Sequence, residues 1–110
     1  MKNNFLCAVT LSVALAACGT AQKGALISAN KALANQKYDE CLQHLSSAET
    51  LGEFSESIHP QVLFKRGMCL EGLNRKPEAY AIYRVLIGRY PSSDWTAQAK
   101  ARLDAALKPY

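Results

Sequence analysis

Apolar residues recur at helical spacing through most of the chain beyond residue 24. They stand three or four positions apart, which is typical of a helix with one buried face. Two polar turns, Asn35-Gln36-Lys37 and Asn74-Arg75-Lys76, and a loop at residues 51–60 interrupt the pattern. Pro91 ends the second hairpin because proline disfavours a helical residue before it. The sequence therefore predicts an all-α fold of two helix-turn-helix hairpins and one further helix.

The two hairpins align with each other at an offset of 38 residues. The aligned pairs are Ala29 with Gly67, Cys41 with Ala79, Leu45 with Tyr83, and Glu53 with Pro91. Small residues at the first two pairs let the helices of a hairpin approach closely, and a larger side chain at the third fills the space beside them. We expect repeats at about residues 25–55 and 60–92, and a capping helix at about residues 93–107.

The second hairpin resembles a tetratricopeptide repeat (TPR). Gly67, Ala79, Tyr83 and Pro91 stand at the small, small, aromatic and proline positions of that repeat. The first hairpin is a weaker copy, with Ala29 and Leu45 at the matching positions and Glu53 in place of the proline. The resemblance implies a short right-handed α-solenoid that binds a peptide or protein partner and carries out no catalysis. The repeats are also similar to those of the Tol-Pal-associated periplasmic TPR protein and of the TPR lipoprotein of the outer-membrane barrel assembly machine.

The N-terminal segment has the character of a bacterial export signal. Lys2 precedes an apolar stretch at residues 5–17, which is shorter than the roughly 20 residues of a membrane-spanning helix. The run Leu15-Ala16-Ala17-Cys18 resembles the lipobox of bacterial lipoproteins. The resemblance implies that residues 1–17 are removed and that Cys18 carries lipid.

The residues after the lipobox bear on where the protein is anchored. Gly19, rather than an aspartate, follows Cys18, and by resemblance to enterobacterial sorting this implies the outer membrane rather than the inner one. Several acyl chains would be needed, because a single chain anchors a protein only marginally. Residues 18–24 are predicted to be a flexible tether between this anchor and a domain that faces the periplasm.

Two cysteines remain in the mature chain besides Cys18. Cys41 and Cys69 are expected on helices that pack side by side, and an oxidising compartment favours a disulfide between them. The alternative is two small buried thiols. Together with His44 and His59 they would also supply four zinc ligands, but their spacing matches no compact zinc motif, so we predict no metal site and no cofactor.

Charge and motifs weigh against several classes of function. The chain has 13 basic and 9 acidic residues, a net charge of +4, and the excess is spread along the sequence. Nucleic-acid binding usually requires a concentrated basic stripe. A serine–histidine–aspartate constellation or a glycine-rich phosphate loop is not recognisable either. We therefore predict no catalytic residues and no nucleic-acid partner.

The first helices of stacked repeats form a concave face that binds partners. The residues predicted on this face are Leu26, Asn30, Leu33, Phe64, Met68 and Glu71. Phe64 and Met68 are apolar yet lie off the stripe that faces their own hairpin, so they are predicted partner contacts; the alternative is that they pack under the chain terminus or the 51–60 loop.

Three functions remain open at this point. The first is a membrane-anchored periplasmic adaptor that mediates protein–protein interaction. The second is a small structural subunit of an envelope assembly, such as barrel-assembly, Tol-Pal or pilus machinery, because two repeats are fewer than the three usually needed for stability. A small enzyme is the third and has the least support.

Overall fold

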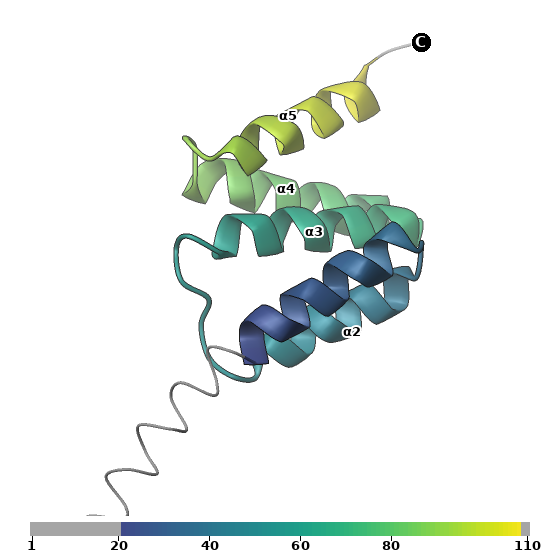
Figure 1. Cartoon of the computed structure of the whole chain (residues 1–110). Helices are drawn as coiled ribbons and strands as arrows, with labels where there is room; N and C mark the ends of the chain where they lie inside the picture. The colour runs from purple at the N-terminus through teal and green to yellow at the C-terminus, as the bar shows by residue number, and fades with distance from the viewer. Residues whose placement is uncertain (1–20, 109–110) are drawn as a thin grey trace, which may run out of the picture.

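The computed structural model describes residues 21–108, and the regular structure in this range is entirely helical. A first helix is described over residues 21–34, and α2 (Tyr38–Glu49), α3 (His59–Gly72), α4 (Lys76–Arg89) and α5 (Asp94–Leu107) follow it. Figure 1 shows these helices stacked in chain order, from the first helix and α2 at one end to α5 at the other. The prediction of an all-α helical-repeat solenoid is thereby confirmed.

The two hairpins turn in the same way, 38 residues apart. Gln36 and Asn74 both adopt the left-handed conformation, each with a φ of 60°. The residue after each of them, Lys37 or Arg75, donates its N–H to a carbonyl five residues earlier, and both hydrogen bonds are 2.8 Å long. This arrangement is a Schellman motif, which satisfies free carbonyls at the end of a helix. The repeat seen in the sequence is therefore also a repeat of backbone geometry.

The residues predicted at structural positions of the repeat are mostly buried. Ala29, Leu45, Gly67, Ala79 and Tyr83 lie in the interior, and Pro91 is exposed in the turn before α5. Tyr83 on α4 lies against Gly67 on α3, where a Cβ atom would overlap the tyrosine ring. The absence of a side chain at Gly67 is thus what allows α3 and α4 to approach closely.

The third helix is the centre of the structure. It contacts α2, α4 and α5, and its residues contribute to both hydrophobic clusters of the domain. Its buried residues are Pro60, Val62, Leu63, Phe64, Gly67, Cys69 and Leu70. Because neighbours cover α3 on several sides, its buried surface is much wider than the single stripe expected of a surface helix.

A disulfide between Cys41 and Cys69 joins α2 to α3. Their Cα atoms are 6.4 Å apart, within the range that the bond requires, and both residues are fully buried. The bond connects the second helix of the first hairpin to the first helix of the second hairpin. It therefore fixes one repeat to the next.

Two side chains fasten the start of α5. Ser93 caps the helix by accepting a hydrogen bond from the Trp95 N–H at 3.2 Å, as serine often does at this position. Thr96 is buried and donates its hydroxyl to the Tyr90 carbonyl at the end of α4. The short turn between α4 and α5 is thus closed by two side chains at the start of α5.

The tether prediction for residues 18–24 is wrong over its second half. Residues 21–24 already belong to the first helix. Gln22 donates its side-chain amide to the Gly52 carbonyl at 3.0 Å, which holds this part of the helix against the segment after α2. The lipobox, with Cys18, lies outside the described residues. None of the helices in residues 21–108 is both long and apolar enough to span a bilayer.

Removal of the disulfide should weaken the whole domain. The bridged residues are 28 positions apart, and closing a loop of this length stabilises a protein by about 3 kcal/mol. We expect the double variant Cys41→Ala, Cys69→Ala to lose about that much free energy of unfolding in urea titrations. Adding reductant should destabilise the wild type similarly and leave the double variant unchanged; equal midpoints for oxidised and reduced wild type would contradict the prediction.

Candidate functional site

The six residues predicted as a partner-binding face do not form an open surface. Phe64 is only 3% exposed, and its ring packs against those of Tyr83 and Trp95, with centroids 5.8 and 5.5 Å away. The prediction that Phe64 contacts a partner is therefore wrong. The physical reason is that α5 covers this side of α3 and makes it part of the core.

The remaining apolar members of that face are also engaged in packing. Leu26 and Leu33 pack, partly buried, against the core of the first hairpin, and Met68 packs against the core of the second. Asn30 is partly buried, and its side-chain oxygen has no hydrogen-bond partner among the described residues. This side of the molecule is consequently occupied by the protein's own contacts.

Glu71, the last residue of the predicted face, connects three helices. Its carboxylate on α3 accepts a hydrogen bond from the Tyr83 hydroxyl on α4 at 2.6 Å and one from Arg102 Nε on α5 at 2.8 Å. Burial by itself raises the pKa of Glu71, but the hydrogen bonds from Arg102 and Tyr83 outweigh it, so the pKa lies below its usual value. Glu71 is thus an ionised structural residue.

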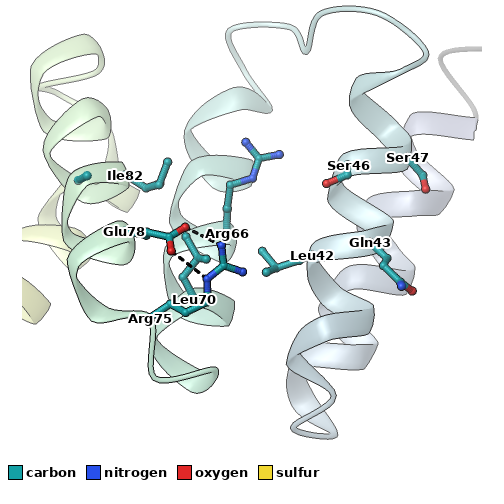
Figure 2. A pocket seen from close by; sticks show the side chains of 10 residues that line it. Leu42, Gln43, Ser46, Ser47, Arg66, Leu70, Arg75, Glu78 and Ile82 are labelled. Carbon is teal, nitrogen blue, oxygen red and sulfur yellow. Dashed lines mark hydrogen bonds and ion pairs between the residues drawn. The ribbon is translucent and has the colours of Figure 1, made fainter.

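An open groove lies on another side of the molecule, between α2 and α4. These two helices do not contact each other, and α3 forms the bottom of the space between them (Figure 2). The groove has a volume of about 910 Å³. Its apolar floor consists of Leu42 from α2, Leu70 from α3 and Ile82 from α4. We refer to this feature as the α2–α4 groove.

The two walls of the α2–α4 groove differ in chemistry. The α2 wall is polar without charge and consists of Gln43, Ser46 and Ser47. The α4 wall carries Arg75 and Glu78, whose side chains form an ion pair at 2.6 Å, drawn as dashed lines in Figure 2. Apolar, hydrogen-bonding and charged groups therefore converge on one opening, an arrangement suited to binding a peptide segment.

Arg66 stands at one end of the α2–α4 groove. It comes from α3 and forms an ion pair with Glu49 at the end of α2. Glu49 also lines a smaller hollow of about 410 Å³ together with His59 and Arg89. The Arg66–Glu49 pair therefore lies between the groove and this smaller hollow.

The smaller hollow contains a histidine whose pKa is perturbed. His59 Nδ1 lies 2.8 Å from the Tyr90 hydroxyl. Burial lowers the pKa of His59 most, the guanidinium groups of Arg89 and Arg66 lower it further, and Glu49 opposes them. His59 is therefore neutral near pH 7, and its ring is a hydrogen-bonding partner for Tyr90.

The cysteines and histidines that were weighed as metal ligands do not assemble. Cys41 and Cys69 are bonded to each other, so neither is free to bind zinc as a thiolate. Residues 21–108 contain no group of three or more histidine, cysteine or acidic side chains placed to hold a metal ion.

Sequence reasoning missed the α2–α4 groove. A usable signal was the pair of adjacent apolar residues in each second helix, Cys41-Leu42 in α2 and Ile82-Tyr83 in α4. The inner member of each pair is buried and the outer one is only partly buried. Such widening of the apolar stripe in the second helix of each hairpin indicates a second surface beside the core.

Comparison with known families finds a tetratricopeptide repeat at residues 61–93. No curated protein and no solved structure matches the chain. The matched segment spans most of α3, all of α4 and the turn before α5, and it contains Gly67, Ala79, Tyr83 and Pro91. Repeats of this kind are protein–protein interaction modules and are generally scaffolds without catalytic activity.

Replacing Glu71 should make stability less dependent on acid pH. Because its pKa is lowered in the folded state, the ionised carboxylate stabilises the fold above the ordinary carboxyl range, and this contribution is lost as the pH falls through the lowered pKa. We expect Glu71→Gln to lower the free energy of unfolding by about 1–2 kcal/mol near pH 7. The difference in stability between the variant and wild type should shrink towards pH 3.

Unfolding titrations in urea across this pH range measure the difference. Glu78→Gln is the matched control, because Glu78 forms an exposed ion pair and its loss should have a much smaller effect. A Glu71→Gln deficit that stays constant from pH 7 to pH 3 would contradict the assignment.

Proposed function

We propose that the protein is a lipid-anchored TPR adaptor of the bacterial cell envelope that holds a protein partner in the α2–α4 groove. The observation that carries this proposal is the open groove with its apolar floor of Leu42, Leu70 and Ile82. A partner that covered these side chains would gain hydrophobic free energy on binding. The proposed location is the outer membrane, with the domain facing the periplasm.

Two features support anchoring in an oxidising compartment. The Leu15-Ala16-Ala17-Cys18 run supplies the lipidation site in the sequence. The Cys41–Cys69 bond is of a kind that persists in exported proteins and is rare in the cytosol. Since the helix is already formed at residue 21, the chain from Cys18 spans roughly 10 Å at most, and the domain would be held close to the membrane surface.

The second candidate is a structural subunit of an envelope assembly, of the barrel-assembly, Tol-Pal or pilus type. It is favoured by apolar side chains exposed at both ends of the solenoid, Ile27 on the first helix at 68% and Leu107 on α5 at 62%. A solenoid buries such positions when further repeats or subunits stack on its ends. The size of the purified protein in detergent separates a free adaptor from a subunit.

Loss of the cysteine thiol should abolish lipidation. The diacylglyceryl group is attached to sulfur, so a protein with Cys18→Ala has no acceptor. We expect metabolic labelling with palmitate to mark the wild type and not the variant, which should accumulate as uncleaved precursor in the membrane fraction. Cys69→Ala is the control and should label normally. Equal labelling of Cys18→Ala and wild type would reject the anchor.

Filling the α2–α4 groove should prevent partner capture in cells. Ser46 lines the groove and is exposed, so a photo-crosslinking amino acid at this position would react with a bound partner. We expect a discrete crosslinked product that disappears when Ala81→Trp is added, because Ala81 lines the opposite wall and the indole would occupy the binding space.

The control for the capture experiment is Ile27→Trp, which adds the same ring at an exposed position on the first helix. It should leave the crosslinked product unchanged. A product that persists with Ala81→Trp would place the partner elsewhere on the protein. No product from any position on the groove would reject the adaptor.

A further inference from the structure

Charge is distributed very unevenly between the helices that form the α2–α4 groove. Residues 38–58 contain five acidic residues and no lysine or arginine. Residues 59–89, which make α3 and α4, contain six basic and two acidic residues, a net charge of +4. The acidic residues of α2 are not among those that line the groove, where α2 contributes only uncharged side chains. The charge of the groove is therefore set by α3 and α4.

The arginines of the groove are available to a ligand to different degrees. Arg75, the residue just before α4, pairs with Glu78 in the first turn of that helix, and their side chains are 48% and 57% exposed. An exposed pair of this kind contributes little, so a carboxylate of a partner can compete with Glu78. Arg66 is more buried, and its one ion-pair partner in residues 21–108 is Glu49.

Arg89 extends the basic character beyond one end of the groove. It is exposed and lies against the Tyr90 ring at 5.4 Å, and it forms no ion pair within the described residues. The lowered pKa of His59 points the same way, because Arg89 and Arg66 affect it more than Glu49 and Glu53 do. Arg89 and Arg66 therefore outweigh the two nearby carboxylates in their effect on His59.

A further exposed apolar residue on α4 follows the groove-lining Ile82 along the helix. Val85 stands three residues beyond Ile82, so the two side chains are neighbours on the helix, and Val85 is 50% exposed. A ligand that follows the groove thus meets apolar groups in the middle and guanidinium groups at both ends, Arg75 at one and Arg66 at the other (Figure 2).

We infer that the α2–α4 groove binds an acidic segment of a protein partner, with apolar side chains on Leu42, Leu70 and Ile82 and carboxylates on Arg66 and Arg75. This inference rests on the proposed function and specifies the partner's chemistry. The hydroxyl and amide groups of the α2 wall, Ser46 and Gln43, hydrogen-bond the backbone of the segment. The surface involved lies between the second helices of the two hairpins, away from the side that the first helices had been expected to offer.

A random-peptide display library panned against the purified mature protein tests this inference. The enriched peptides should combine large apolar residues with several aspartates or glutamates, and weaken in binding as ionic strength rises. A synthetic copy of the most enriched peptide, labelled with a fluorophore, then serves as the probe in anisotropy titrations against variants at Ala81. This exposed position lines the groove and makes no part of the core.

The variants separate charge from size. Ala81→Gln and Ala81→Glu add side chains of the same length, and only the second adds a negative charge. We expect Ala81→Glu to bind about 10-fold or more weakly than Ala81→Gln, because like charges repel across an interface. Ala81→Lys should bind at least as tightly as Ala81→Gln. Ile27→Glu adds the same charge on the distant first helix and should bind as wild type does.

Several outcomes would overturn the inference. An acidic occupant would be rejected if the library enriched basic or uncharged peptides. It would also be rejected if no peptide were sensitive to Ala81→Trp, or if the Kd values for Ala81→Gln and Ala81→Glu were equal. A dimer in detergent that Ala81→Trp dissociates would make the occupant a second copy of this chain.

The inference and the proposed function can fail separately. If the crosslinked product from Ser46 disappears with Ala81→Trp but forms equally with Ala81→Glu and Ala81→Gln, the adaptor function is supported and the acidic partner is rejected. A missing product in every variant would reject the adaptor itself.

Discussion

The close contact between Tyr83 and Gly67 is the interaction on which the rest of the structure depends. It sets how near α4 lies to α3, because any side chain at position 67 would overlap the ring. With the ring in this place, the tyrosine hydroxyl reaches Glu71, and Glu71 in turn holds Arg102 of α5. One aromatic side chain therefore determines the spacing of the second hairpin and the position of the helix that follows it.

The helices and their repeat could be predicted because both depend on local chemistry. The turns at Gln36 and Asn74 recur after 38 residues with the same backbone geometry, and the small residues of the aligned stripes are buried as their pattern indicates. The role of Phe64 could not be predicted in this way. Periodicity shows that a helix has an apolar face, but it does not show how many neighbours the helix has, and α3 packs against α2, α4 and α5.

The α2–α4 groove escaped prediction for a related reason. It exists because two helices that are both packed on α3 do not meet each other, and the spacing of residues within either helix does not record the distance between the two. Leu42 and Ile82 look like ordinary members of their apolar stripes. Arg66 and Arg75 look like ordinary surface charges, and only the fold brings all four residues to one opening.

The groove is well suited to binding because each of its walls is fixed to the same floor. The disulfide holds α2 on α3, and the Gly67–Tyr83 contact holds α4 on α3. A binding site whose walls are already in place loses less conformational entropy when a partner enters. The disulfide between the repeats therefore bears on binding as well as on stability. Together with the packing of α2 on α3 and the Arg66–Glu49 ion pair, the disulfide keeps the α2 wall at a constant distance from α4.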